Sequence, residues 1–101
     1  MWYKVASIGA MADGKPIKVL AGGEKLMLIK KAEKVFAVSA ICSHEDKELL
    51  NGRFVEEEWE CPHHGGRFDL ATGRATHMPI VAPITSFPVR VDDGQVFVEV
   101  D

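Results

Sequence analysis

Four side chains in two short motifs have the types and spacing of a metal site. Cys42 and His44 form a C-x-H motif, and Cys61 and His64 form a C-x-x-H motif. Within each motif the short spacing lets one loop present two ligands, and the 16 residues between His44 and Cys61 can run out and back as a hairpin. Thiolate and imidazole ligands together suit zinc or iron–sulfur chemistry and exclude hard cations such as magnesium.

The order C-x-H, 16 residues, then C-P-x-H-G resembles the signature of Rieske iron–sulfur proteins. The run Gly65–Gly73 and the loop Pro79–Pro83 look like the same family. The resemblance is carried by motifs in the second half of the chain. Its two motifs together are specific, whereas either one alone is weak.

Carried over residue by residue, the resemblance implies one [2Fe–2S] cluster per chain. Cys42 and Cys61 would bind one iron, and His44 and His64 would bind the other. His63 falls at the variable position of the motif and would be a spectator. Two other interpretations of the residues stay open, namely a structural zinc site with all four ligands on one ion and a Cys42–Cys61 disulfide.

Length and composition predict one compact domain, residues 1–101, with 47% hydrophobic residues. The net charge of −3 argues against a nucleic-acid partner, which usually needs a basic face. No apolar run approaches the length of a membrane span, and Met1–Lys4 does not begin a signal peptide. We therefore expect a cytoplasmic protein with no membrane partner.

Short apolar runs separated by turn residues predict an all-β protein. The clearest pair of strands is joined by Asp93-Gly94, a dipeptide that favours a tight hairpin turn. Pro88 predicts an edge position, because proline cannot donate a ladder hydrogen bond. The predicted strands are Tyr3–Ser7, Ile17–Leu20, Lys25–Lys30, Val35–Ser39, Arg53–Glu56, Glu58–Cys61, Gly66–Asp69, Thr85–Val91 and Gln95–Val100.

The resemblance implies how these strands are arranged. It implies an antiparallel β-sandwich of the Rieske type, in which two loops, about 42–46 and 61–66, form a small cluster-binding lobe. A third loop, Met78–Ile84, would cover the cluster from another side. Trp59 lies two residues before Cys61 and so shares its face of a strand, where we expect it to pack in the core. We expect His77 to be a solvated loop residue.

Departures from the family pattern narrow the resemblance. Respiratory and photosynthetic Rieske proteins carry a second cysteine pair, whereas this chain has only two cysteines. Gly66 and Phe68 stand where those proteins carry a serine and a tyrosine whose hydroxyls bond to the cluster sulfurs. Fewer such hydrogen bonds stabilise the reduced form less, so we expect a low potential for a Rieske centre.

The pattern is most similar to the free-standing Rieske-type ferredoxins of bacterial aromatic-ring dioxygenase systems. This resemblance implies a one-electron carrier that is not an enzyme by itself. The sequence does not indicate an oligomeric state, and a monomer is our default expectation. Its partners would be a flavin-containing ferredoxin reductase and a terminal Rieske non-haem iron oxygenase. Two other functions stay open: the small subunit of an assimilatory nitrite reductase and a zinc-stabilised binding module.

Acidic residues are concentrated between the two motifs. Residues 45–60 hold seven acids against Lys47 and Arg53, which gives this segment a charge of 2 − 7 = −5. The segment is either a solvated hairpin face or a surface that steers a basic partner. The acids are Glu45, Asp46, Glu48, Glu56, Glu57, Glu58 and Glu60.

Overall fold

The computed structural model describes residues 1–32, 34–41, 50, 52–56, 58–61, 66–77 and 83–100. Eleven strands and one short 3-10 helix account for its regular structure, and every strand pair is antiparallel. The all-β prediction is therefore confirmed. No helix among these residues is long and apolar enough to cross a lipid bilayer.

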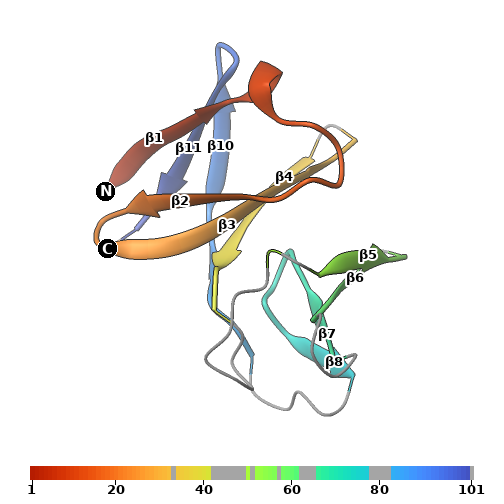
Figure 1. Cartoon of the computed structure of the whole chain (residues 1–101). Helices are drawn as coiled ribbons and strands as arrows, with labels where there is room; N and C mark the ends of the chain where they lie inside the picture. The colour runs from red at the N-terminus through yellow and green to blue at the C-terminus, as the bar shows by residue number, and fades with distance from the viewer. Residues whose placement is uncertain are drawn as a thin grey trace.

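Three sheets build the molecule (Figure 1). The first has the order β1-β11-β10, the second β2-β3-β4-β9 and the third β5-β6-β7-β8. The first and second sheets form a base that holds both chain ends, and the third is a separate lobe (Figure 1). The strands of the base are β1 (Trp2–Ser7), β2 (Ile17–Ala21), β3 (Glu24–Lys31), β4 (Lys34–Ser39), β9 (Ser86–Phe87), β10 (Val89–Asp92) and β11 (Gln95–Glu99). The strands of the lobe are β5 (Arg53–Val55), β6 (Glu58–Glu60), β7 (Arg67–Asp69) and β8 (Ala75–His77), and the 3-10 helix η1 is Ile8–Ala10.

The second sheet is the middle layer of the protein. Leu26 and Leu28 of β3 pack in one core with Val96 and Val98 of β11. The intervening residues of β3, Met27 and Ile29, pack in a second core with the lobe. All four β3 residues are fully buried, because successive side chains of a strand point to opposite faces. The continuous apolar run Leu26–Ile29 thus reflects a strand covered on both sides.

The predicted strand Thr85–Val91 is in fact two strands. β9 pairs with β4 in the second sheet, whereas β10 pairs with β11 in the first. Pro88 lies between them, and its carbonyl accepts a hydrogen bond from the Glu99 amide at 3.0 Å. A residue without an N–H fits the point where the chain leaves one ladder and enters another, and both strands are edge strands as predicted.

One strand was not predicted. β8 (Ala75–His77) pairs with β7, so His77 is a strand residue and the loop prediction for it is wrong. The register of the β7–β8 pair shifts between Arg67 and Phe68, and β8 has only three residues. So short a segment shows no usable alternation in the sequence.

Candidate metal centre

Cys61 directly follows the last residue of β6, Glu60, and lies in the core between the middle sheet and the lobe. Cys61 is only 3% exposed, and it shares this core with Trp59 and Phe68, both of which are fully buried. The Cys61 amide donates a hydrogen bond to the Gly66 carbonyl at 2.7 Å. This bond joins the two described residues on either side of positions 62–65, so the C-x-x-H motif begins at a fixed, buried point.

The other three predicted ligands, Cys42, His44 and His64, lie outside the described residues, as does His63. The described residue Ala40, two positions before Cys42, is fully buried in the same core as Cys61. Its amide donates to the Lys25 carbonyl at 3.0 Å, which fixes this end of the first motif to β3. Both motifs therefore adjoin one core.

A third segment returns to that core. Residues 78–82 are not among those described, so the prediction that the Met78–Ile84 loop covers the cluster stays a prediction. Ile84 is buried with Cys61, and its amide donates to the Gly73 carbonyl at 2.9 Å. The adjacent Thr85 carbonyl accepts a hydrogen bond from the Ser39 amide at 2.9 Å. Ile84 and Thr85 are thus held to Gly73 and to Ser39, and Ser39 precedes Cys42 by three positions.

One face of the lobe sheet carries a row of apolar side chains directly opposite one another. The row is Phe54 (β5), Trp59 (β6), Phe68 (β7) and Ala75 (β8). The Phe54 and Trp59 rings meet edge to face, with centroids 5.2 Å apart. The row packs toward Met27, Ile29 and Val38 of the middle sheet. It confirms the prediction that Trp59 and Cys61 share the buried face.

Gly52 lets the first lobe strand approach this row. A Cβ atom at Gly52 would overlap the Glu60 carbonyl oxygen and lie 2.6 Å from the Trp59 indole nitrogen. Only glycine fits here without movement of the backbone next to Cys61. The Asn51-Gly52 step in the sequence suggested a turn but did not indicate this close contact.

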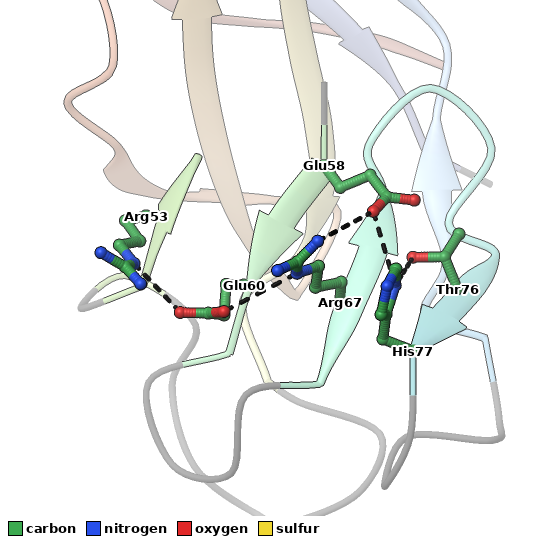
Figure 2. A network of polar contacts seen from close by, with 6 residues as sticks. All are labelled: Arg53, Glu58, Glu60, Arg67, Thr76 and His77. Atoms are coloured by element: carbon green, nitrogen blue, oxygen red, sulfur yellow. Dashed lines mark hydrogen bonds and ion pairs between the residues drawn. The ribbon is translucent and has the colours of Figure 1, made fainter. Parts of the chain in front are cut away.

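The opposite face of the lobe sheet carries charged side chains that form ion pairs across the strands (Figure 2). Arg53 Nε lies 3.0 Å from Glu60 Oε1, and Arg67 Nε lies 3.7 Å from Glu60 Oε2. Arg67 Nη1 and His77 Nδ1 lie 3.9 and 3.6 Å from Glu58 Oε1. We call Arg53, Glu58, Glu60, Arg67 and His77 the charged row.

The charged row changes the interpretation of the acidic segment. Glu58 and Glu60 face two arginines of their own chain, so they do not form an unpaired acidic surface. Glu56 is exposed, at the turn after β5. The other four acids of the segment lie outside the described residues, so a docking role for them stays a prediction. Sequence reasoning missed these pairs because they depend on the β6–β7 register.

The surroundings of Cys61 fit a sulfur ligand to a buried metal cluster. Its neighbours Trp59, Phe68, Leu70 and Ile84 are apolar and exclude water from this side of the site. A thiolate buried among apolar groups is costly unless a cation or metal compensates its charge. No group of three or more ligand-type side chains occurs within the described part of the chain, which omits three of the four predicted ligands.

Comparison with known proteins decides the family. The Rieske [2Fe-2S] domain description matches residues 1–88. The chain belongs to the Rieske [2Fe–2S] family. Its cofactor is therefore a [2Fe–2S] cluster, as the resemblance of the two motifs implied.

Several of the similar proteins are ferredoxins of dioxygenase systems. The ferredoxin component of the p-cumate 2,3-dioxygenase system of Pseudomonas putida is 40% identical over 92 residues, which covers 89% of this chain and 78% of that protein. The ferredoxin of carbazole 1,9a-dioxygenase from Nocardioides aromaticivorans superposes with a TM-score of 0.92 at 35% identity, covering 97% of this chain and 96% of that one. The structural match spans nearly the full length of both chains, so the Rieske-type β-sandwich is confirmed.

Two further structures bear on function. One is a complex of reduced oxygenase and oxidized ferredoxin in carbazole 1,9a-dioxygenase. The matching chain of that complex superposes with a TM-score of 0.88 at 31% identity, and the match covers 96% of this chain and 91% of that chain. The other is a protein named as a nitrite reductase small subunit, with a TM-score of 0.87 at 20% identity and 99% of each chain covered. The second likeness shows the fold alone.

Proposed function

We propose that this protein is a soluble, cytoplasmic one-electron carrier that passes electrons from a flavin-dependent NAD(P)H reductase to a terminal aromatic-ring dioxygenase. The observation that carries the proposal is the match of residues 1–88 to the Rieske domain, together with relatives that are named ferredoxin components over nearly this whole chain. Such components transfer electrons and are not catalytic alone. The nitrite reductase alternative has only a likeness of fold in its support.

We assign the ligands by the motif, with Cys42 and Cys61 on one iron and His44 and His64 on the other. When bound, the cluster supplies one reversible electron at a potential raised by its two neutral imidazoles. The fully buried Ala40 and the buried Cys61 and Ile84 support convergence of the three segments on one core. We further propose that residues 1–101 form one domain and that the protein is a monomer.

The protein's own residues keep the thiolate side of the site dry. Trp59 and Phe68 cover Cys61 from within the lobe, and Met27 and Ile29 complete the core from the middle sheet. Fixed, apolar surroundings of this kind reduce the rearrangement that accompanies a change of charge. Electron exit would then use the imidazole side, where His44 and His64 belong in the proposed ligand set.

Reconstitution of electron flow tests the proposal. The purified protein would be added under anaerobic conditions to the reductase and oxygenase of the p-cumate dioxygenase system, in place of its ferredoxin, and NADH-dependent product would be measured. We expect product to depend on this protein and to be lost in the Cys61→Ser variant. The same protein should give no electron flow to a sirohaem nitrite reductase, and the reverse pattern would contradict the proposal.

A further inference from the structure

We propose that Arg67 is a positioning residue for the cluster, which it serves by bridging Glu60 and Glu58 at the base of the loop that carries Cys61 and His64. The inference rests on the ligand set proposed above. It adds a role for Arg67 of the charged row, which pairs with Glu60 and Glu58 across β6 and β7.

The position of Arg67 in the ladder is the first reason. Glu60 immediately precedes Cys61, Arg67 immediately follows Gly66, and Glu60 and Arg67 are directly opposite one another in β6 and β7. Glu60 is the last residue of β6 and Arg67 is the first residue of β7, so both lie next to the Cys61–Gly66 hydrogen bond. A change in their separation would therefore be transmitted directly to the base of the loop.

The second reason is shielding. The side chains of Arg67, Glu60 and Glu58 are only 26%, 19% and 25% exposed, respectively, whereas Arg53 is 75% exposed. Charge pairs withdrawn from water are screened less than surface pairs, and the loss of one partner leaves the other charge poorly solvated. The pairs of Arg67 should thus contribute more than the exposed Arg53–Glu60 pair, although the latter is shorter.

The third reason is the environment of one atom. Arg67 Nε is buried and makes no direct hydrogen bond within the described part of the chain. Glu60 Oε2, 3.7 Å away, is beyond hydrogen-bond distance but supplies a compensating negative charge. Because the Glu60 charge alone compensates this buried nitrogen, the stability of the Arg67 side chain depends on the distance between β6 and β7.

The charged row also reaches the third segment. His77 lies opposite Arg67 in the ladder, and its Nδ1 is 3.6 Å from Glu58 Oε1 (Figure 2). His77 is the last residue of β8, directly before the 78–82 stretch. Arg67 and Glu58 therefore sit between the strand ends that lead into two of the three segments.

Iron release tests this role. The visible absorbance of the purified holoprotein would be followed in the presence of an iron chelator for wild type, Arg67→Gln and the matched control Arg53→Gln. Loss of a group that orients metal ligands typically costs about 10-fold to 100-fold in metal retention, so we expect about 10-fold faster release from Arg67→Gln. Arg53→Gln, which also loses a pair to Glu60 but does not flank the loop, should change release less than about twofold.

Further variants separate positioning from general stability. Val98→Ala removes core volume in the base and shows how far lower stability alone accelerates release. Arg67→Gln should release iron faster than Val98→Ala even where the two variants have the same melting temperature. Arg67→Gln should also shift the EPR spectrum of the reduced protein, whereas Val98→Ala should leave that spectrum unchanged. Arg67→Lys keeps the positive charge, and its rate of iron release should lie between those of wild type and Arg67→Gln. The double variant Glu60→Gln/Arg67→Gln should accelerate iron release by less than the product of the two single-variant factors, because the two side chains form one pair.

The outcomes that overturn the inference are distinct. If Arg67→Gln and Arg53→Gln release iron equally fast, Arg67 has no special role while the ligand set stands. If Arg67→Gln assembles no cluster, the iron-release rates of Arg67→Lys and Glu60→Gln are the test. If both of these variants release iron as slowly as Arg53→Gln, the inference is overturned. A wild-type protein without iron and sulfide would overturn the ligand set and this inference together.

Discussion

At the residue scale, Cys61 is the predicted ligand whose surroundings the structure describes. It is buried among aromatic and aliphatic side chains and hydrogen-bonded through its backbone to Gly66. The sequence predicted this site from four residue types and two spacings, because thiolates and imidazoles at such spacing have few other uses. It did not predict the charged row, whose members are far apart in sequence and meet only through strand register.

The assignment of adjacent histidines gives a first prediction. His64→Ala should abolish or cripple cluster binding, because it removes one of the two nitrogen ligands. His63→Ala, a change of the same kind one position away, should retain the cluster. Iron and acid-labile sulfide per chain measure both. Loss of iron and sulfide in His63→Ala with retention in His64→Ala would show that the register of the motif is wrong.

Phe68 gives a second prediction at this scale. It is fully buried in the core that holds Cys61. By the resemblance, it stands where respiratory and photosynthetic Rieske proteins carry a tyrosine hydroxyl. Without that donor, the midpoint potential should lie below 0 mV. Phe68→Tyr should raise it, by about 40 mV if a new hydrogen bond strengthens by about 1 kcal/mol on reduction.

Protein-film voltammetry measures this potential. Phe87→Tyr, at a partly buried position that packs in the base core, is the control and should leave the midpoint unchanged. A wild-type midpoint well above 0 mV would contradict the account of the missing hydroxyls.

At the element scale, the strands were largely predictable and their partners were not. Val96, Val98 and Val100 alternate in the sequence and are buried as the alternation predicts. The division of Thr85–Val91 between two sheets and the three-residue strand β8 could not be read from local patterns. Both depend on contacts with strands elsewhere in the chain, which periodicity does not report.

The β7–β8 turn gives a third prediction. Gly73 has φ +79°, and a Cβ atom there would overlap the Ile84 carbonyl oxygen, beside the amide that anchors the third segment. Gly73→Ala should therefore lower the free energy of unfolding by about 2–4 kcal/mol, the sum of backbone strain and overpacking.

Gly14→Ala is the matched control for that change. Gly14 has a similar φ of +75° but open space around its Cβ position, so it measures the backbone cost alone, about 1 kcal/mol. Urea unfolding of both variants gives the difference. Equal destabilisation would show that the contact with Ile84 does not matter.

At the scale of the whole molecule, the middle sheet packs against the first sheet on one face and against the lobe on the other. Lys31 at the end of β3 links these parts, since its ammonium donates to the Glu56 carbonyl at 2.6 Å and lies 4.7 Å from the Phe54 ring centroid. The short apolar runs predicted an all-β protein, and the resemblance implied a sandwich with a lobe of two loops. The sequence did not predict that the lobe has a four-stranded sheet with one apolar and one charged face, because three-residue strands are too short to show alternation.

Two sulfur and two nitrogen ligands on a bridged pair of irons form the site that we propose. Metal and sulfide analysis of the purified protein, combined with pulsed EPR of its reduced form, tests this ligand set. We expect two irons and two acid-labile sulfides per chain, with nitrogen couplings from two imidazoles. A colourless protein with stoichiometric zinc, or a cluster that shows no nitrogen coupling, would contradict it.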